Sequence, residues 1–473
     1  MGSLMQLGVL EQAAKVKSGE IAASELLEAA IEEIEVKNPV VNAVVIKCYE
    51  QARESLQSLT DHQPFAGVPF LLKDMVAEMA GTPLTEGSAF LKGYVSEQDS
   101  EFVARLKRAG FLILGKTNTP EYASKPTTEP LLYGPSKNPW DLSRSTGGSS
   151  GGAAAAVASG MVAVAHANDG GGSIRVPAAA CGLVGLKPTR ARNPLGPHYG
   201  DIGAGLICEH VVTRSVADNA ALLDVLAGPL AGEPYGLPAA TASYVDEVSR
   251  EPGRMRIAFS DSALIETHVD PQCVAGVHEI ATLLENQGHD IVEAKPNVEA
   301  TNFSEFFTTI WICTMAWAIR DWERRTGRTP QKEHFEPHTW RMFCLDEQKR
   351  PSDFLMAVQD MHKFSLQVGP FFETYDAWLT PTLPIPAPPL GYFDYDKAHP
   401  KQATQRLEQF PSFTSIANVT GNPAITLPLC CADDGLPIGM QLTAGNGKEA
   451  LLLQLAGQLE RAKPWAARWP ELT

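Results

Sequence analysis

The stretch Arg144-Ser-Thr-Gly-Gly-Ser-Ser-Gly-Gly152 holds four glycines and three serines in nine residues. A run of this composition is typical of a flexible linker. Directly after it, however, we predict a helix of small residues from Ala153 to Ser159 and a buried strand from Met161 to Ala165. A loop that leads into such buried elements belongs to a folded core, so the linker interpretation is disfavoured.

Two other loop types can be weighed against the same residues. A phosphate-binding loop of the G-x-x-x-x-G-K-[ST] type is excluded, because no lysine follows the glycines. Gly147 to Gly151 does satisfy G-x-S-x-G, the nucleophile elbow of α/β-hydrolases. That elbow needs a later aspartate and a late histidine, whereas the last histidine of this chain, His399, lies far from the C-terminus. The elbow is therefore the weaker interpretation.

Composition narrows the class of protein further. The 473 residues carry a net charge of −16 and are 44% hydrophobic, so the chain can bury a large core but lacks the basic surface of a nucleic-acid binder. No apolar run reaches the ~18 residues of a membrane span. The eight cysteines include no C-x-x-C pair, and the eleven histidines no H-E-x-x-H. We therefore expect a cytoplasmic protein with reduced thiols, without a metal, a nucleic-acid partner or membrane association.

Helices and apolar strands alternate along the first part of the chain. Gly67 to Asp74 reads as a short buried strand that ends on two charged residues. Glu101 to Gly110 is an amphipathic helix closed by glycine, and the strand Phe111 to Leu114 follows it. This alternation predicts an α/β fold built in layers.

The two ends of the chain share turn-and-strand patterns, and the middle differs from both. Residues 193–405 are rich in prolines and aromatics, and the strand patterns return at residues 415–445. Because both ends read as parts of one sheet, we expect a single domain over residues 1–473, with 193–405 as a variable region that shapes the substrate site.

Two more segments complete a pattern with the first stretch. Asn168-Asp-Gly-Gly-Gly-Ser-Ile-Arg-Val-Pro177 is a second glycine-rich loop, and Gly67-Val-Pro69 opens the strand that ends in Lys73-Asp74. In content and spacing the three segments resemble the amidase signature family, strongly over residues 60–190 and again over 415–445. The resemblance extends to three flanking motifs: Asn138-Pro-Trp140, Gly185-Leu-Lys-Pro-Thr189 and Thr420-Gly-Asn-Pro-Ala424.

The resemblance implies the fold, the activity and the catalytic residues. The fold would be the amidase signature fold, a mixed central β-sheet covered by helices on both faces. The activity would be hydrolysis of amide C–N bonds without a cofactor, through an acyl-enzyme. Ser173 would be the nucleophile, Lys73 the base, and Ser149 the bridging serine in a cis peptide bond with the preceding glycine.

The chemistry of these side chains agrees with the roles that the resemblance implies. A serine hydroxyl becomes a good nucleophile when a neighbouring base takes its proton, and a lysine can do this only when it is neutral. The apolar run Val68 to Leu72 could bury Lys73 and so depress its pKa. Ser149 could then relay a proton between Lys73 and Ser173. The spacing favours Ser149 over Ser150, which we expect to be a supporting hydrogen-bonding residue.

The second glycine-rich loop offers backbone donors beside the nucleophile. The N–H groups of Gly170, Gly171 and Gly172 are not shielded by side chains, so they could form an oxyanion hole for a tetrahedral intermediate. Asp169 and Arg175 are better explained as a structural ion pair that holds this loop than as catalytic residues.

One departure from the family pattern concerns the substrate. Many members have G-T-D-T-G-G-S where this chain has Ala167 to Ser173, and the local sequence looks more like the branch of 6-aminohexanoate cyclic-dimer hydrolases and urethane-cleaving amidases. The small-molecule substrate would then be a bulky or aryl amide, a carbamate or an amide oligomer. Eight aromatics lie between residues 303 and 340 and are either core residues or the lining of an apolar pocket: Phe303, Phe306, Phe307, Trp311, Trp317, Trp322, Phe335 and Trp340.

Two other functions fit the same signature. The A subunit of a glutamine-dependent amidotransferase carries it too, but would act with partner subunits, and the aromatic middle region and the acidic charge suit a free-standing hydrolase better. That hydrolase could still be a homo-oligomer. A binding module without catalysis would not need the intact set Lys73, Ser149 and Ser173.

Overall fold

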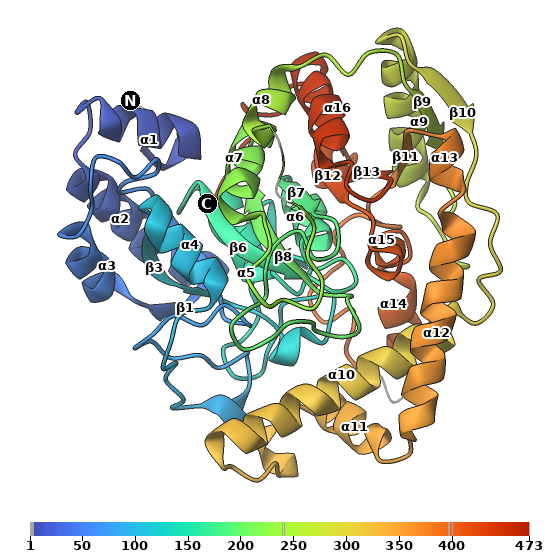
Figure 1. Ribbon diagram of the computed structural model, residues 1–473, viewed down its shortest axis with the longest axis horizontal. Helices are drawn as coiled ribbons and strands as arrows, with labels where there is room; N and C mark the ends of the chain where they lie inside the picture. The colour runs from blue at the N-terminus through green and yellow to red at the C-terminus, as the bar shows by residue number, and fades with distance from the viewer. Residues whose placement is uncertain (1–3, 239, 241, 396–397, 400, 473) are drawn as a thin grey trace.

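A continuous β-sheet of eleven strands crosses the computed structural model from one side to the other (Figure 1). The structure describes residues 4–238, 240, 242–395, 398–399 and 401–472. The strands of this sheet, in spatial order, are β1 (Val44–Lys47), β3 (Leu112–Thr117), β2 (Pro69–Lys73), β6 (Val164–Asp169), β8 (Cys208–Thr213), β7 (Val184–Lys187), β12 (Ala424–Cys431), β13 (Pro437–Ala444), β11 (Ala377–Pro381), β9 (Arg256–Phe259) and β10 (Asp290–Glu293). A small separate pair joins β4 (Lys137–Asn138) and β5 (Asp141–Ser145).

The sheet is mixed, and its parallel pairs lie toward the two sides. Strand β2 is parallel to β3 and to β6, and β9 is parallel to β10 and β11. From β6 through β8, β7, β12 and β13 to β11, neighbouring strands are antiparallel. The predicted α/β class with a mixed central sheet is therefore confirmed.

Both faces of the sheet are buried, and successive side chains along a strand point to opposite faces. Phe70 and Leu72 of β2 pack into one apolar cluster, whereas Leu71 between them packs into another on the opposite face. The first face is covered by α1 (Val9–Lys17), α4 (Glu101–Ala109) and α7 (Val216–Leu226), and this covering continues over the C-terminal strands with α8 (Tyr244–Ser249), α9 (Pro271–Asn286) and α16 (Glu449–Ala462). The second face is covered by α2 (Ala23–Val41), α3 (Tyr49–Leu56), α5 (Gly151–Ala158) and α6 (Arg175–Cys181).

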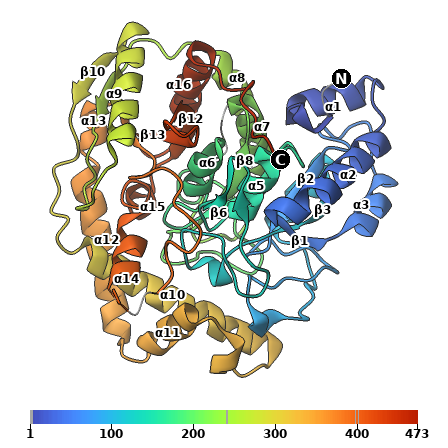
Figure 2. The same cartoon turned by 180° about the vertical axis from the view of Figure 1, so that it is seen from behind.

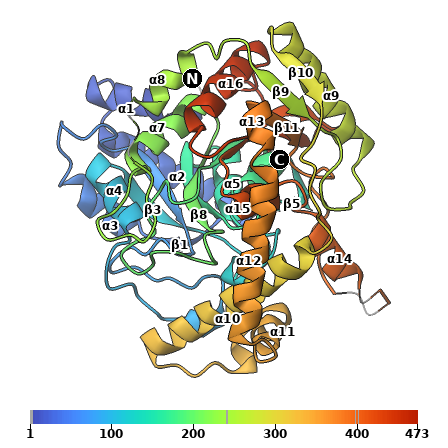
Figure 3. The same ribbon diagram turned by 45° about the vertical axis from the view of Figure 1, so that its right-hand side comes forward.

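The remaining α-helices lie between residues 303 and 420, and apolar side chains of three of them pack in one cluster with Ala258 of β9 and Trp378 of β11. The remaining helices are α10 (Phe303–Thr326), α11 (Pro337–Asp346), α12 (Pro351–Val368), α13 (Phe371–Thr374), α14 (Gln402–Gln409) and α15 (Ser415–Thr420). Figure 3 shows α12 along the outside of the molecule, with α10 and α11 at its foot. Seen from behind, α1 to α3 lie at one end of the sheet and α9 with β10 at the other (Figure 2). None of the helices in the described part of the chain combines the length and apolarity needed to cross a membrane.

The local sequence explains where these elements begin and end. At the predicted helix 101–110, Ser100 Oγ accepts a hydrogen bond from the Val103 N–H, and Gly110 ends the helix with φ of 97°. The predicted strand Met161–Ala165 is misplaced, because β6 begins at Val164 and runs on to Asp169. Residues 160–163 instead close helix α5: the Met161 N–H donates to the Ala156 carbonyl, and Gly160 has φ of 72°.

Helix α5 lies in the core because its residues are small. All eight of its residues are buried, and all but Val157 are Gly or Ala. The helix packs against β6 and α6. A Cβ atom at Gly152 would overlap the backbone of Asn118 and lie 2.8 Å from the Ala43 carbonyl oxygen. The glycines of the first quoted stretch therefore allow the backbone segments around the loop to approach one another.

The Gly152→Ala variant is predicted to be less stable than the wild type by about 1–3 kcal/mol, because the added methyl group meets rigid backbone on two sides. Urea denaturation followed by circular dichroism measures this difference. Gly369→Ala is the matched control, since Gly369 is already in a right-handed helical conformation and the nearest atom to its Cβ would be 3.6 Å away. Equal stability of the two variants would contradict this account of the packing.

Candidate active site

The predicted site residues meet at the carboxyl ends of two neighbouring parallel strands. Lys73 is the last residue of β2, and Asp169 is the last residue of β6. The loop after β6 carries Ser173 into helix α6, and the quoted glycine–serine loop brings Ser149 to the same edge of the sheet just before helix α5. Carboxyl ends of parallel strands are a common place for a ligand site, because the loops that follow them converge there.

Lys73 and Ser149 are in direct contact. The Lys73 Nζ atom donates to Ser149 Oγ at 2.7 Å and to Asn168 Oδ1 at 2.6 Å, and the side chains of Lys73 and Ser149 are fully buried. The Gly148–Ser149 peptide bond is cis, as the sequence predicts. Ser150 points elsewhere: its hydroxyl donates to the Asn168 carbonyl at 3.3 Å. The geometry thus places Ser149, not Ser150, on the lysine.

The environment of Lys73 favours its neutral form. Burial lowers the pKa of Lys73 to about 7, against the opposing effect of the negative charges of Asp169 and Glu209. At neutral pH a substantial fraction of this amine is therefore unprotonated and able to accept a proton. An exposed lysine would be almost entirely protonated under the same conditions.

Three residues around Lys73 were not singled out from the sequence as site residues. Asn168 accepts the hydrogen bond from the Lys73 ammonium, and the Lys73 backbone N–H donates to His166 Nδ1 at 3.2 Å. On the other side of the imidazole, His166 Nε2 lies 3.2 Å from Glu209 Oε1, with all of these groups buried. The departure from the family pattern at Ala167 to Ser173 was a signal for Asn168, whereas no motif marks Glu209.

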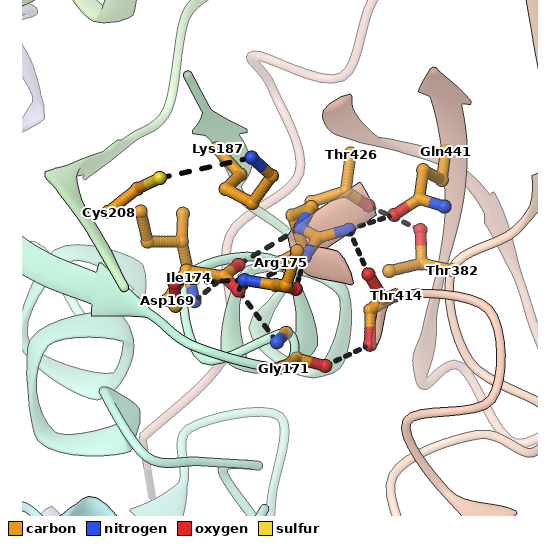
Figure 4. Close-up of polar contacts among 12 residues, drawn as sticks. Asp169, Gly171, Ile174, Arg175, Lys187, Cys208, Thr382, Thr414, Thr426 and Gln441 are labelled. Carbon is orange, nitrogen blue, oxygen red and sulfur yellow. Dashed lines mark hydrogen bonds and ion pairs between the residues drawn. The ribbon is translucent and has the colours of Figure 1, made fainter. Parts of the chain in front are cut away.

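The ion pair predicted between Asp169 and Arg175 is present and fully buried. The guanidinium binds both carboxylate oxygens, with Nε at 2.9 Å from Oδ2 and Nη2 at 3.0 Å from Oδ1 (Figure 4). Arg175 also donates to the Thr414 carbonyl and to Gln441 Oε1, each at 2.8 Å, and to Asn418 Oδ1 at 2.7 Å. The guanidinium thereby links the loop after β6 to strand β13 and helix α15.

Asp169 in turn holds the backbone of its own loop. Its carboxylate accepts hydrogen bonds from the N–H groups of Gly172 and Ile174 and from the Asn418 amide. Burial alone would raise the pKa of Asp169, but the charge of Arg175 and these donors outweigh it and hold the pKa below its ordinary value. Loss of either partner would leave the other charge buried and unpaired, which typically costs about 3–5 kcal/mol.

The contact between Gly172 and Asp169 corrects one sequence prediction. The Gly172 N–H donates to Asp169 Oδ1 at 2.6 Å, so it is not available as the oxyanion donor that the sequence predicted. At Gly170 a Cβ atom would meet Ile207 and the ring of Trp311, which explains why the loop needs glycine there. The Gly171 carbonyl accepts from Thr414 Oγ1 at 2.7 Å, which fixes the orientation of the adjoining peptide groups (Figure 4).

Ser173 lies where two cavities meet. An outer cavity of about 170 Å³ is bounded by Gly148, Gly171 and Ser173 on the loop side, and an inner cavity of about 50 Å³ by Ser149 and Ser173. Ser173 is half-buried, so part of its surface is open to these cavities. Within the described residues no hydrogen bond joins the hydroxyl groups of Ser149 and Ser173, so the full relay predicted from the sequence is not formed in this structure.

The aromatics between residues 303 and 340 divide between the core and the cavities. The outer cavity is lined by Phe303, Phe307 and Trp311, together with aliphatic residues such as Val176, Met342 and Leu407. Trp311 also borders the inner cavity, with Trp317 and Trp322. The remaining members of the group, Phe306, Phe335 and Trp340, pack in the apolar clusters of the middle region.

Comparisons with known proteins agree on one family. A model of the amidase family matches residues 25–453. A 6-aminohexanoate-cyclic-dimer hydrolase of Paenarthrobacter ureafaciens is 40% identical, over 98% of this chain and 96% of its own. An acylamidase of Rhodococcus erythropolis is 35% identical, over 99% and 98%. The solved structure of a 6-aminohexanoate cyclic dimer hydrolase complexed with substrate matches with a TM-score of 0.95 and 38% identity, over 99% of both chains.

Proposed function

The chain belongs to the amidase family and is a hydrolase of amide C–N bonds, and from this premise we propose that it works through an acyl-enzyme on Ser173. Ser149 is the bridging residue and Lys73 the base. The observation that carries the proposal is the contact between Lys73 Nζ and Ser149 Oγ at 2.7 Å, made by an amine whose pKa is about 7.

In the proposed reaction a proton moves from Ser173 through Ser149 to Lys73 and later returns through Ser149 to the leaving group. Neutral Lys73 takes the proton of Ser149 as Ser149 takes that of Ser173, and Ser173 Oγ attacks the amide carbonyl. The N–H groups of Gly170 and Gly171 stabilise the oxyanion, since that of Gly172 is bound to Asp169. When the C–N bond breaks, the proton returns through Ser149 to the leaving nitrogen. A water molecule then hydrolyses the ester by the same route.

The outer cavity supports a bulky or aryl substrate. Its aromatic and aliphatic lining offers many apolar contacts and few hydrogen-bonding partners for a small polar amide. The relatives named as a cyclic-dimer hydrolase and an acylamidase support amides with large groups at the carbonyl or the nitrogen. Carbamates share the attacked carbonyl with amides, so we include them among the proposed substrates.

The proposal also includes the domain organisation of the chain and its cellular location. The continuous sheet, which draws strands from both ends of the sequence and from its middle, supports a single amidase domain. All eight cysteines are free thiols, which supports a cytoplasmic location.

Ser173→Ala is predicted to lose both amide turnover and covalent labelling by a fluorophosphonate, because no other hydroxyl takes the place of the nucleophile. Mass spectrometry of the labelled protein measures the adduct, and circular dichroism shows whether the variant is folded. Ser304→Ala is the matched control, since Ser304 lines the same outer cavity and should remain labelled. Wild-type labelling of Ser173→Ala would exclude Ser173 as nucleophile.

The wild-type kcat/KM is predicted to rise about tenfold per pH unit below pH ~7 and to level off above it, because only the neutral form of Lys73 accepts a proton and its pKa is about 7. Lys73→Met should lose about 10²–10⁴-fold in kcat/KM and show no inflection near pH 7. Initial rates between about pH 5.5 and 9 test both statements. A rate that falls on raising the pH through 7 would contradict a neutral lysine base.

Bulky aryl amides and aryl carbamates are predicted to be better substrates than acetamide. Each buried methylene adds ~0.8 kcal/mol of apolar contact, or about fourfold in kcat/KM when it is retained in the transition state. A turnover series from acetamide through acetanilide to longer acyl anilides, measured by release of aniline, tests this. If acetamide gives the highest kcat/KM, the outer cavity is not an acyl or aryl site.

A further inference from the structure

The inner cavity contains a group that the proposed mechanism does not use. Its walls are mostly apolar and include one carboxylic acid residue, Glu86. Five aromatic residues are part of the lining: Tyr122, Tyr199, Trp311, Trp317 and Trp322. Glu86 precedes strand β3 by many residues and is brought here by the loop that follows β2. A carboxyl group in an aromatic chamber beside a reactive serine needs an explanation, because burying an unpaired charge is costly.

The carboxyl group of Glu86 is buried and has negatively charged neighbours. Among the described residues it forms no ion pair, although it is only 2% exposed and accepts a hydrogen bond from Trp322 Nε1 at 3.1 Å. Burial raises the pKa of Glu86 to about 8, and the nearby carboxylates of Asp74 and Glu78 act in the same direction. A cation placed beside Glu86 would reverse this shift and pair the charge.

The basic side chains near Glu86 bind other groups. Arg325 Nη2 lies 2.6 Å from Glu78 Oε1, and Lys116 Nζ donates to the Pro83 carbonyl at 2.6 Å. Lys73 is bound to Ser149 and is largely neutral near pH 8. None of them forms an ion pair with Glu86, so a cation that pairs with this carboxyl group would come from a ligand.

Tyr122, another residue of the cavity wall, carries a second buried polar group. The Tyr122 hydroxyl is buried and forms no hydrogen bond of normal geometry within the described residues, although the Ser88 hydroxyl lies near it. The inner cavity thus has a carboxyl group and aromatic faces, and both kinds of group bind alkylammonium ions.

The position of Ser149 indicates which half of the substrate enters the inner cavity. Ser149 lines the inner cavity, whereas the outer cavity is bounded by Gly148, Gly171 and Gly172. In the proposed mechanism Ser149 returns the proton to the leaving nitrogen, so that nitrogen and its substituent lie on the side of Ser149. The acyl group then extends into the outer cavity.

We propose that the inner cavity binds the amine half of the substrate and that Glu86 selects amides whose amine half carries a second, cationic amino group, as in a monoacylated diamine. This inference rests on the proposed function, because it uses Ser149 as the proton donor to the leaving nitrogen. The ammonium group pairs with Glu86, and the rings of Trp311, Trp317 and Trp322 surround its methylene chain.

Matched substrates test the inference. Monobenzoyl diamines from 1,2-diaminoethane to 1,6-diaminohexane are compared at about pH 8 with N-alkylbenzamides in which a methyl group replaces the ammonium. For at least one chain length we expect kcat/KM of the wild type to be about tenfold higher for the ammonium substrate. In Glu86→Gln that ratio should fall to about one. A ratio of one at every length in the wild type would overturn the inference.

Two controls separate this inference from stability and from the proposed function. Glu121→Gln removes another buried carboxyl group, one that binds Ser88 and the Glu336 N–H rather than the cavity, and it should keep the wild-type ratio. If Glu86→Gln does not fold, inhibition of wild-type anilide hydrolysis by n-butylammonium and by 1-butanol decides instead, and equal inhibition would overturn the inference. Turnover by Ser173→Ala would overturn the proposed function, whatever the ratio.

Discussion

The buried ion pair between Asp169 and Arg175 is the interaction on which the rest of the site depends. It spans the loop that carries Ser173, from the last residue of β6 to the first residue of α6. The carboxylate fixes two N–H groups of that loop, and the guanidinium reaches across to Gln441 and Asn418. Because both charges have every partner they need, a pair that would otherwise be costly to bury becomes a rigid joint between the two ends of the chain.

Arg175 and Lys73 are both buried basic side chains, but burial has different effects on their charge. Arg175 binds the Asp169 carboxylate through both Nε and Nη2 and stays a cation, since a guanidinium hardly ever loses its proton. Lys73 meets a hydroxyl and an amide oxygen, neither of which carries a charge, so burial lowers its pKa to about 7. The residues at 149, 168 and 169 thus determine which side chain stays a cation and which can become neutral.

The sequence predicted those site residues that belong to short local motifs. Lys73, Ser149 and Ser173 stand at fixed places in three local motifs, and the structure brings all three to one edge of the sheet. Glu209 could not have been assigned in this way, because it comes from a later strand and no motif marks it. The same holds for Asn418 and Gln441, which reach Arg175 from more than 240 residues away along the chain.

Errors in the prediction have local physical causes. The apolar run from Met161 reads as strand, but Gly160 and its neighbours are needed to turn the chain out of helix α5, so the strand starts later. The oxyanion donors were inferred from the absence of side chains on three glycines. That criterion does not distinguish a free N–H group from one that already donates to a neighbouring carboxylate. The Gly172 N–H donates to Asp169.

The order of the strands has a consequence for the biosynthesis of the protein. Strands β12 and β13, from residues 424–444, lie between β7 and β11 in the sheet, so the last strands to be translated fill its interior rather than its edge. Until they emerge from the ribosome, β7 and β11 each expose an unpaired edge, and Arg175 lacks Gln441. A nascent chain therefore cannot complete the site before the β12–β13 hairpin has been translated. Truncation before this hairpin removes strands from the interior of the sheet and not from its edge.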